Sequence, residues 1–135
     1  MQAKYHYSVL IHEQAKKYGT KPVITFRNFG SLEWKSVSWN QFSMRVKQVS
    51  NALINLLKPQ ERIAVFAQNC IQYLYTDFGA YGVRVITIPF YASSSEQQIQ
   101  YMIQDANIRY VFVGEQEQYN KAHRVLPLCP SLERI

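Results

Sequence analysis

The sequence predicts an α/β protein with a parallel three-layer α/β/α sheet and a short β-hairpin near its N-terminus. Two observations support the parallel sheet. Between Arg62 and Gly114, short apolar runs alternate with amphipathic stretches in the order strand, helix, strand, helix, strand. Each amphipathic stretch is long enough to return the chain across the sheet, which parallel pairing requires. A hydrophobic fraction of 47% and a charged fraction of 18% suit one globular domain over residues 1–135.

The first part of the chain predicts a helix followed by a hairpin. Apolar residues recur at helical spacing over residues 5–18, and Gly19 ends that pattern. Two β-prone runs follow at residues 23–26 and 34–39. The segment Asn28-Phe29-Gly30-Ser31 between them carries turn residues, so an antiparallel hairpin is expected.

The helix after the hairpin has the clearest signals in the sequence. Ser38 and Gln41 form the S-x-x-Q pattern of a capping box at its start, and Pro59 lies beyond its end. The residues expected to face inward recur at spacings of three and four: Phe42, Val46, Val49, Leu53 and Leu56.

Three parallel strands are then predicted, at residues 63–67, 84–88 and 109–113. Pro89 is expected to end the second strand, because proline cannot donate to a central ladder. Asn69 is the expected cap of the helix between the first two strands, and Gly82 its left-handed end. The buried face of that helix is predicted from four residues: Ile71, Leu74, Tyr75 and Phe78.

Two more helices follow the second and third strands. Ser93 and Glu96 match a second capping box, which opens a helix with four inward residues: Ile99, Met102, Ile103 and Ala106. A last helix is predicted over residues 117–128, stopped by Pro130. The segment Leu132-Glu133-Arg134-Ile135 resembles the entry to a further strand. We therefore expect the sheet to be incomplete within this chain.

Composition excludes several classes of protein. No apolar run approaches the roughly 20 residues that cross a bilayer, and the N-terminus has no signal-peptide pattern. Cys70 and Cys129 lie too far apart in sequence to predict a disulfide framework or a metal knuckle. The histidines, His6, His12 and His123, lack the spacing that places two ligands on one helix face. A cytoplasmic protein without a metal site is the expectation.

The formal charge of +6 raises the question of an anionic partner. The 15 basic residues are spread along the chain, and the longest basic run is Lys16-Lys17. A nucleic-acid-binding stripe would gather basic residues on one face. A mildly basic surface is therefore favoured, with no nucleic-acid partner expected.

Candidate phosphate and anion sites find little support in the sequence. The five glycines, at positions 19, 30, 79, 82 and 114, match neither of the two glycine-rich phosphate-loop patterns. Gly79 and Gly82 lie late in a predicted helix, where close packing and a C-terminal cap account for them. Ser93, Ser94 and Ser95 follow a strand and open a helix, so they could hold an anion, although capping already accounts for one of them.

Candidate catalytic residues are equally sparse. Cys70 is placed at a helix N-terminus, which favours a thiolate, but no histidine lies near it in sequence, so buried filler is favoured. The first parallel strand ends in Ala67-Gln68-Asn69, without the carboxylates of a phosphorylated receiver module. The nine acidic residues form no pair suited to acid–base chemistry, and the ten tyrosines suit packing. We assign no catalytic residue and no metal ligand, and the cofactor-binding residues stay undetermined.

The order of these segments resembles the N-terminal region of AMP-forming acyl-CoA synthetases, in the adenylate-forming superfamily. That family shows W-x-x-F at a helix start, a strand R-[IV]-A-[IV], a helix-starting Asn and G-x-x-x-[IV]-P. The corresponding residues here are Trp39-Asn40-Gln41-Phe42, Arg62-Ile63-Ala64-Val65, Asn69 and the segment from Gly82 to Pro89. Phe90-Tyr91-Ala92-Ser93 and the run from Tyr110 to Glu115 are most similar to the long-chain fatty-acid branch. The resemblance extends from about Tyr7 to Ile135.

The resemblance implies a fatty-acid–CoA ligase that uses ATP, Mg²⁺ and coenzyme A and forms an acyl-adenylate before the thioester. The family's phosphate loop, ribose-binding acid and catalytic lysine have no matching position in this chain. We therefore carry over no catalytic residue and expect the chain alone, as an incomplete N-terminal subdomain, to be inactive. Peripheral contact with the inner face of a membrane and a dimer through an exposed sheet edge or face both stay open. The rival interpretations are a flavodoxin- or receiver-like binding module and a basic nucleic-acid-binding domain.

Overall fold

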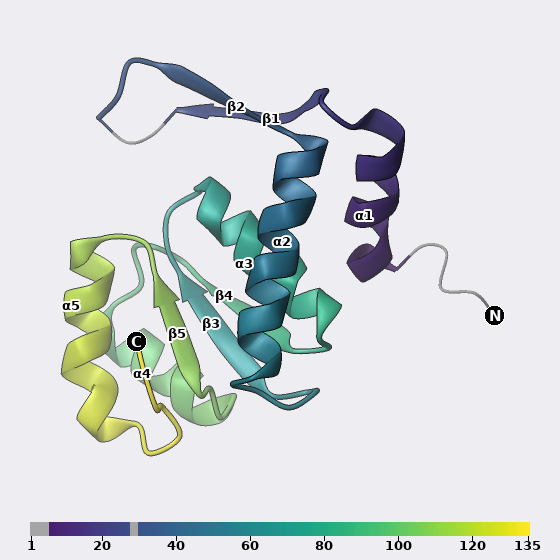
Figure 1. Ribbon diagram of the computed structural model, residues 1–135. Coiled ribbons are helices and arrows are strands. Elements are labelled where there is room, and N and C mark those ends of the chain that lie inside the picture. Colours follow the sequence, from purple (N-terminus) through teal and green to yellow (C-terminus); the bar gives the residue numbers. More distant parts are fainter. Residues whose placement is uncertain (1–5, 28–29) are drawn as a thin grey trace. The chain divides into compact units, whose positions relative to one another are not determined.

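A computed structural model describes residues 6–27 and 30–135 (Figure 1). The chain divides into two compact units. The first, called here the helical unit, comprises residues 1–56 and 70–84. The second, called the sheet unit, comprises residues 57–69 and 85–135. The prediction of a single domain over residues 1–135 stays a prediction.

The helical unit combines three helices with the predicted hairpin. Its elements in chain order are α1 (Tyr7–Tyr18), β1 (Pro22–Arg27), β2 (Trp34–Ser38), α2 (Trp39–Ile54) and α3 (Ile71–Gly82). The strands β1 and β2 pair antiparallel, with Ile24 opposite Val37 and Arg27 opposite Trp34. This confirms the hairpin, although Asn28 and Phe29 of its predicted turn lie outside the described residues.

The core of the helical unit forms around one face of α2. Phe42 and Val46 are buried together with Ile11 of α1, and Leu74, Tyr75 and Phe78 of α3 pack against them. Leu53 is also buried, as predicted. Leu56 is exposed, which corrects its predicted inward position. The reason is that α2 ends at Ile54, so the chain leaves the helical path before Leu56.

Two of the predicted helix boundaries in the helical unit are confirmed. Ser38 and Gln41 form the reciprocal capping box at the start of α2. Gly19 ends α1 with a φ of 53°, a left-handed value that glycine adopts at little cost.

The two boundaries predicted for α3 are wrong. Cys70, not Asn69, occupies its N-terminal capping position, and no side chain caps the helix there. Gly82 is the last helical residue, and the left-handed position falls on Arg84, with a φ of 61°. A Cβ at Gly82 would lie 2.6 Å from Ser50 Oγ, so the glycine packs closely against the Ser50 side chain.

The sheet unit contains the three parallel strands. Its elements are β3 (Arg62–Phe66), β4 (Ile86–Phe90), α4 (Glu96–Asp105), β5 (Tyr110–Val113), α5 (Gln116–Val125) and a 3₁₀ turn, η1 (Leu126–Leu128). The strands lie in the order β4-β3-β5, and both pairings are parallel. In this register Ala64 lies opposite Ile88 on one side and Val111 on the other.

The position of the second strand corrects the sequence prediction. The strand β4 begins at Ile86 and runs through Pro89, which pairs with Val65. The strand is at the edge of the described sheet, and half of an edge strand's N–H groups face away from the ladder. Proline is tolerated there for that reason.

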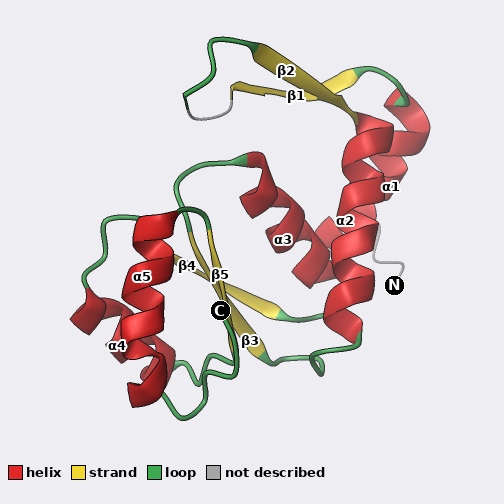
Figure 2. Ribbon diagram, turned by 60° about the vertical axis from the view of Figure 1, so that its left-hand side comes forward, coloured by secondary structure: helices red, strands yellow, loops and turns green. Residues whose placement is uncertain are grey.

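One face of the sheet is covered by α4 and α5 (Figure 2). The residues of this core that are buried on the strands are Ala64, Phe66, Phe90 and Val111. Ile99 and Ile103 of α4 and Val125 of α5 pack onto them, with Met102 and Ala106 partly buried at the margin. The inward face predicted for α4 is therefore confirmed.

The ends of α4 and α5 differ from the prediction. The capping box of α4 is formed by Ser95 and Gln98, not by Ser93 and Glu96. The last helix ends at Val125 and tightens into the 3₁₀ turn, which covers the remainder of the predicted range.

The predicted further strand entry is confirmed beside β5. Glu133 N–H donates to Arg109 O at 2.8 Å, and Val111 N–H donates to Arg134 O at 3.1 Å. Tyr110 and Arg134 form a parallel bridge. The segment after η1 thus continues the sheet on the side of β5.

Candidate functional site

Three loops of the sheet unit meet at the carboxyl edge of its parallel strands. They follow β3 at residues 67–69, β4 at residues 91–95 and β5 at residues 114–115. In open parallel sheets, ligands bind outside the carboxyl ends of the strands. This edge is therefore the candidate site, and its loops decide what it can bind.

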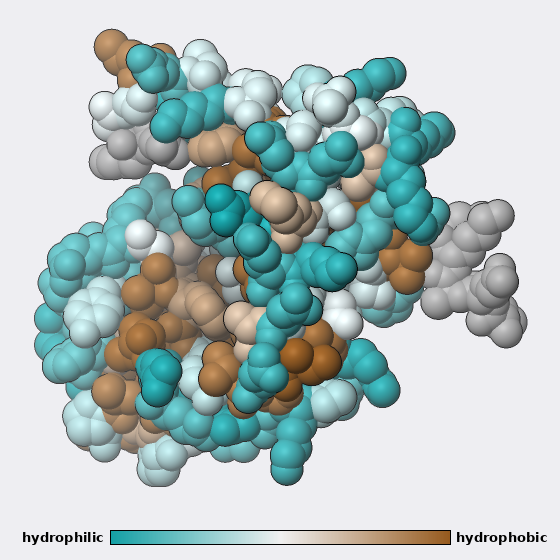
Figure 3. Space-filling model, viewed as in Figure 1, coloured by the Kyte–Doolittle hydropathy of each residue, from teal (hydrophilic) through white to brown (hydrophobic). Residues whose placement is uncertain are grey.

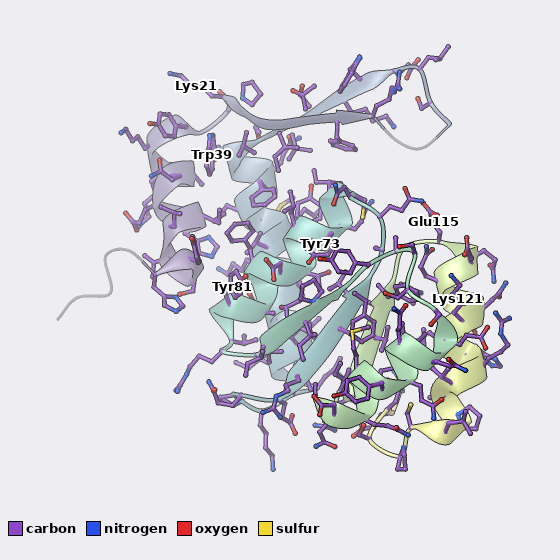
Figure 4. The ribbon with its side chains drawn as sticks, turned by 180° about the vertical axis from the view of Figure 1, so that it is seen from behind. Lys21, Trp39, Tyr73, Tyr81, Glu115 and Lys121 are labelled. Atoms are coloured by element: carbon purple, nitrogen blue, oxygen red, sulfur yellow. The ribbon has the colours of Figure 1, made fainter. Side chains whose placement is uncertain are left out.

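The loops after β3 and β5 are in direct contact. Gly114 N–H donates to Phe66 O at 3.1 Å, and a Cβ on Gly114 would lie 2.7 Å from Ala67 Cβ. Glycine is required at this position by the close approach of the two chains. Gln68 Nε2 lies 3.5 Å from a carboxylate oxygen of Glu115, a long hydrogen bond across the same edge. Figure 4 shows Glu115 where β5 gives way to α5.

Gln118 connects α5 with the loop after β4. Its side chain is only 1% exposed, and Nε2 donates to Ala92 O at 3.2 Å. Its Oε1 has no hydrogen-bond partner among the residues that the structure describes. A glutamine on an amphipathic helix is usually a solvent-facing residue, so the sequence carried no signal for this buried contact.

The serines after β4 form a cap rather than an open anion site. Ser95 Oγ accepts from Gln98 N–H at 3.3 Å, and Gln98 Oε1 accepts from Ser95 N–H at 2.8 Å. Ser94 is buried. The capping box uses the N–H groups of Ser95 and Gln98, and Ser94 N–H donates to Tyr91 O at 2.9 Å, so the structure gives the anion hypothesis for Ser93, Ser94 and Ser95 no support.

The geometry around Cys70 does not favour a nucleophile. The thiol is half-buried at the start of α3. The described histidines of the helical unit contact hydroxyls instead, His6 with Ser8 and His12 with Ser43, each at 2.6 Å. Within residues 6–27 and 30–135, no three His, Cys, Asp or Glu side chains are grouped so that they could hold a metal ion.

Gly79 is explained by packing between α2 and α3. A Cβ there would lie 2.6 Å from Val49 Cγ1, and Ser50 Oγ donates to Gly79 O at 2.8 Å. The predicted packing role of the two helical glycines is confirmed for both Gly79 and Gly82.

Tyrosines of the helical unit contribute to packing. The Tyr7 ring stacks on Tyr81 at a centroid distance of 5.9 Å and meets Phe78 edge-on at 6.2 Å. Tyr81 Oη donates to Asp77 Oδ2 at 2.9 Å. Burial, together with the Asp77 carboxylate, raises the pKa of Tyr81 to about 12. Tyr73 and Tyr81 both lie on α3 (Figure 4).

A charged network at the amino edge of the sheet has a structural role. Arg109 contacts Glu61 at 2.7 Å and Glu133 at 2.6 Å, and Tyr110 Oη donates to Glu133 at 3.0 Å. The hydrogen bond from Arg109 and then that from Tyr110 lower the pKa of Glu133. The pKa of Glu61 is also lowered, first by the backbone N–H of Lys58 and then by Arg109. These bonds join the start of β5 to the turn before β3.

Comparison with known proteins identifies the class. The sequence profile of the family described as AMP-binding enzyme matches residues 11–135. The chain therefore belongs to the AMP-binding enzyme family. Its mixed α/β fold, with a parallel three-stranded sheet and a short antiparallel pair, matches the N-terminal part of adenylate-forming enzymes.

Relatives in this family are long-chain-fatty-acid–CoA ligases. The chain is 23% identical to mouse ACSBG2 over 119 residues, which cover 87% of the chain and 18% of that ligase. It is 20% identical to heimdall of Drosophila melanogaster over 126 residues, 91% of the chain and 18% of that ligase. The chain thus spans less than a fifth of the length of either relative.

Solved structures share the fold at similarly low identity. The long-chain-fatty-acid–CoA ligase FadD1 from Archaeoglobus fulgidus superposes with a TM-score of 0.84 at 19% identity, over 96% of this chain and 26% of that one. The anthranilate CoA ligase AuaEII, in complex with anthranoyl-AMP, gives a TM-score of 0.86 at 17% identity, over 100% of this chain and 26% of that one.

Among the helices that the structure describes, none combines the length and apolar character needed to cross a membrane.

Proposed function

We propose that this chain is part of a long-chain fatty-acid–CoA ligase. The carboxylate of the fatty acid attacks the α-phosphate of ATP, which releases pyrophosphate and leaves an acyl-adenylate. The thiol of coenzyme A then attacks the acyl carbon and releases AMP. The observation that carries the proposal is the family match over residues 11–135, in a chain whose parallel strands follow the order β4-β3-β5.

The choice of a long-chain acid rests on the relatives. Several curated relatives carry that name, at 20–25% identity. The structural neighbours are broader in substrate, since they include an anthranilate and a benzoate CoA ligase. The acid therefore has to be identified by competition between aliphatic and aromatic carboxylates.

The described residues do not fit a site for Mg²⁺ or for the phosphates of ATP. No metal-binding group of three side chains occurs among them, and the capping box of α4 occupies two of the N–H donors beside the serines, those of Ser95 and Gln98. We assign to this chain a positioning role instead. Its carboxyl edge, tightened by the Gly114–Ala67 contact and by Gln118, forms one wall of the substrate cleft. Other parts of the protein hold the metal ion, the nucleotide and coenzyme A.

The first test separates the chain from the whole protein. The protein encoded by the full reading frame is incubated with ATP, Mg²⁺, coenzyme A and either palmitate, octanoate or benzoate, and released AMP and thioester are measured. We expect palmitoyl-CoA to form fastest. The 135-residue chain alone serves as the control and should release no AMP above background. Faster turnover of benzoate would overturn the long-chain assignment, and robust turnover by the chain alone would overturn the positioning role.

The second test addresses the wall itself. Tyr91 is the first residue after β4 and is highly exposed at the carboxyl edge, so a cleft at this edge would use its ring. In the whole protein, Tyr91→Ser should raise KM for the acid several-fold with a smaller change in kcat. Tyr101→Ser, an exposed tyrosine on α4, is the matched control and should leave both constants unchanged. Equal effects of the two variants would argue against a wall formed by this loop.

A further inference from the structure

Three helices have glutamine as their third residue, and one of these glutamines behaves differently from the other two. Gln41 in α2 and Gln98 in α4 turn back to the start of their own helix, where the amide oxygen accepts from the N–H of the capping serine at 2.9 Å and 2.8 Å. Gln118 occupies the same position in α5, but no side chain caps that helix. Its amide therefore serves a different contact.

The amide of Gln118 turns into the interior of the sheet unit. The residue is 1% exposed, although the solvent-facing surface over α5 is largely hydrophilic (Figure 3). Nε2 donates to Ala92 O, in the loop after β4, at 3.2 Å. The two residues are 26 positions apart in the sequence. A side-chain donor on α5 thus holds the backbone of the loop after β4.

The other half of the same amide has no partner. Gln118 Oε1 is one of three buried side-chain oxygens without a hydrogen bond among the described residues, with Thr87 Oγ1 and Ser131 Oγ. A buried acceptor without a partner costs stability, so a half-matched amide contributes little net stability. An apolar side chain of similar size would suit a purely structural position as well. Local violations of this kind are expected at functional sites.

The residue positioned by this hydrogen bond is Tyr91. On one side of it, Phe90 ends β4 and is 3% exposed, and on the other side Ala92 O is held by Gln118. Tyr91 O also accepts from Ser94 N–H at 2.9 Å. The ring of Tyr91 is nevertheless exposed, since the residue is 86% accessible to solvent. An exposed ring on a fixed backbone is suited to bind a ligand, because little freedom is lost on binding.

We infer that Gln118 is a positioning residue for the acid substrate, because it holds the loop that carries Tyr91. The inference rests on the proposed ligase function and adds to it the contact that fixes the wall of the cleft. Gln118 is buried and acts through the backbone of Ala92. Loss of its donor should therefore weaken binding of the acid more than it slows the chemical steps.

The first experiment replaces the amide in the whole protein. Gln118→Met retains the length of the side chain and removes both the donor and the unmatched oxygen. It should raise KM for palmitate about fivefold, the factor that one intramolecular hydrogen bond typically contributes, with a smaller change in kcat. The melting temperature should stay the same or rise. A clear fall in melting temperature would assign Gln118 a structural role and overturn the inference.

The matched control is another glutamine that donates to a backbone carbonyl. Gln104 is exposed near the C-terminal end of α4, and its Nε2 donates to Leu128 O at 2.8 Å. Gln104→Met should leave KM for palmitate unchanged, because it does not hold the loop after β4. Equal effects of Gln104→Met and Gln118→Met on KM would argue against the positioning role.

A double variant tests whether Gln118 acts through Tyr91. If it does, removal of the amide has no further effect once the ring is gone. Tyr91→Ser combined with Gln118→Met should then have the same KM as Tyr91→Ser alone. Effects of the two substitutions that multiply would show that they act independently and would refute the assigned link.

A pH profile supplies a readout that a structural role would not change. In Gln118→Glu, the introduced carboxyl can donate to Ala92 O only while it is protonated. The KM of this variant, divided by that of the parent, should therefore rise from about pH 5 to about pH 9. A ratio that is constant over this interval would mean that the donor to Ala92 O does not control binding of the acid.

Hydrogen exchange tests the loop without turnover. In Gln118→Met, the amides of residues 92–95 should exchange about fivefold faster, because the loop opens more often, and those of β3 should not change. Unchanged exchange in the loop would overturn the inference even in an active enzyme. A parent protein that turns over none of the acids would overturn the proposed function and the effect on KM. Hydrogen exchange would still decide whether Gln118 fixes the loop.

Discussion

The helical unit and the sheet unit differ in how they use charge. In the sheet unit, Arg109 lies between two carboxylates, and α4 and α5 are joined by an ion pair between Glu96 and Arg124. In the helical unit, Glu13 and Lys16 form the ion pair found among described residues, and most basic side chains project from the surface. The net charge of +6 is therefore located in the helical unit, and the sheet unit has equal numbers of basic and acidic residues.

The two units also differ in the contacts that hold their cores. The helical unit relies on aromatic side chains, with Phe42 in contact with Tyr75 at 5.3 Å and Phe78 at 5.9 Å. The sheet unit relies on aliphatic side chains above a hydrogen-bonded ladder, with one aromatic pair between Phe66 and Phe90 at 6.0 Å. Substitutions at matched positions can therefore separate aromatic contacts from buried area.

The largest expected effects come from the two buried phenylalanines. Phe42 is 1% exposed and Phe66 is 0% exposed, so alanine at either position should lower the free energy of unfolding by about 3–5 kcal/mol. Phe42→Ala should cost more, because it removes two aromatic contacts rather than one. Urea denaturation measures both variants. A larger loss for Phe66→Ala would show that aromatic geometry adds little in the helical unit.

The next largest effect is expected at Gly79. In Gly79→Ala the new Cβ would meet Val49 Cβ at 2.7 Å, so α2 and α3 must move apart, at a cost of about 1–3 kcal/mol. Gly82→Ala is the matched variant, because its Cβ would meet only the Ser50 hydroxyl, which can rotate. Higher helix propensity then offsets a lost hydrogen bond, and stability should change little. Thermal unfolding of the two variants in parallel gives the comparison.

The helices and strands were predictable from the sequence because they depend on the spacing of apolar residues. That spacing can be read without knowing which elements pack together. Their boundaries depend on local competition. Ser93-x-x-Glu96 and Ser95-x-x-Gln98 are overlapping capping patterns. Which of them starts the helix depends on where β4 and the loop after it end, and neither pattern shows that. The parallel direction of the three strands followed from the alternation of strand and helix, whereas their order β4-β3-β5 comes from the structure. The extension of β4 through Pro89 depended on its edge position, which is a property of the sheet.

The candidate site was less predictable than the fold. Gln118 is buried because its amide meets a carbonyl from another loop, a contact without a sequence pattern. The requirement for glycine at Gly114 likewise arises from Ala67 on a different strand end. The concentration of charge in the helical unit can be counted from the sequence, because residues 1–56 contain eight basic and two acidic residues and residues 70–84 add one of each.

Alkaline pH should act on the helical unit through Tyr81. The pKa of its phenol is raised to about 12 from an ordinary value of 10.0, so the folded state holds this proton more tightly than the unfolded state. Its contribution to stability is complete below pH 10 and is lost as the pH rises toward 12. Tyr81→Phe should flatten the fall in stability over this interval, measured as the urea midpoint against pH. An unchanged slope would mean that Tyr81 ionises without cost to the fold.

Acidic pH should act on the sheet unit through Glu133. Arg109 and Tyr110 hold the pKa of this carboxyl below its ordinary value of 4.5. The stabilisation is therefore complete above pH 4.5 and is lost as the pH falls through the lower, folded-state pKa. Glu133→Gln should be less stable near neutral pH and lose less on acidification than the parent. The control is Glu33→Gln on the exposed hairpin loop, which should retain the slope of the parent.

The smallest effect is expected from the ion pair between α4 and α5. Glu96 and Arg124 are both largely exposed, so solvent screens their attraction, and a double-mutant cycle with Glu96→Gln and Arg124→Gln should give a coupling of about 0.2–1 kcal/mol. The cycle is needed because Glu96 also lies in the first turn of α4, where a negative charge is favourable by itself. Glu13 and Lys16 provide the equivalent exposed pair in the helical unit, within a single helix. Both couplings should vanish in about 1 M salt, where the Debye length is near 3 Å. A coupling between Glu96 and Arg124 that persisted in high salt would mean that this ion pair stabilises the sheet unit, beyond making its net charge neutral.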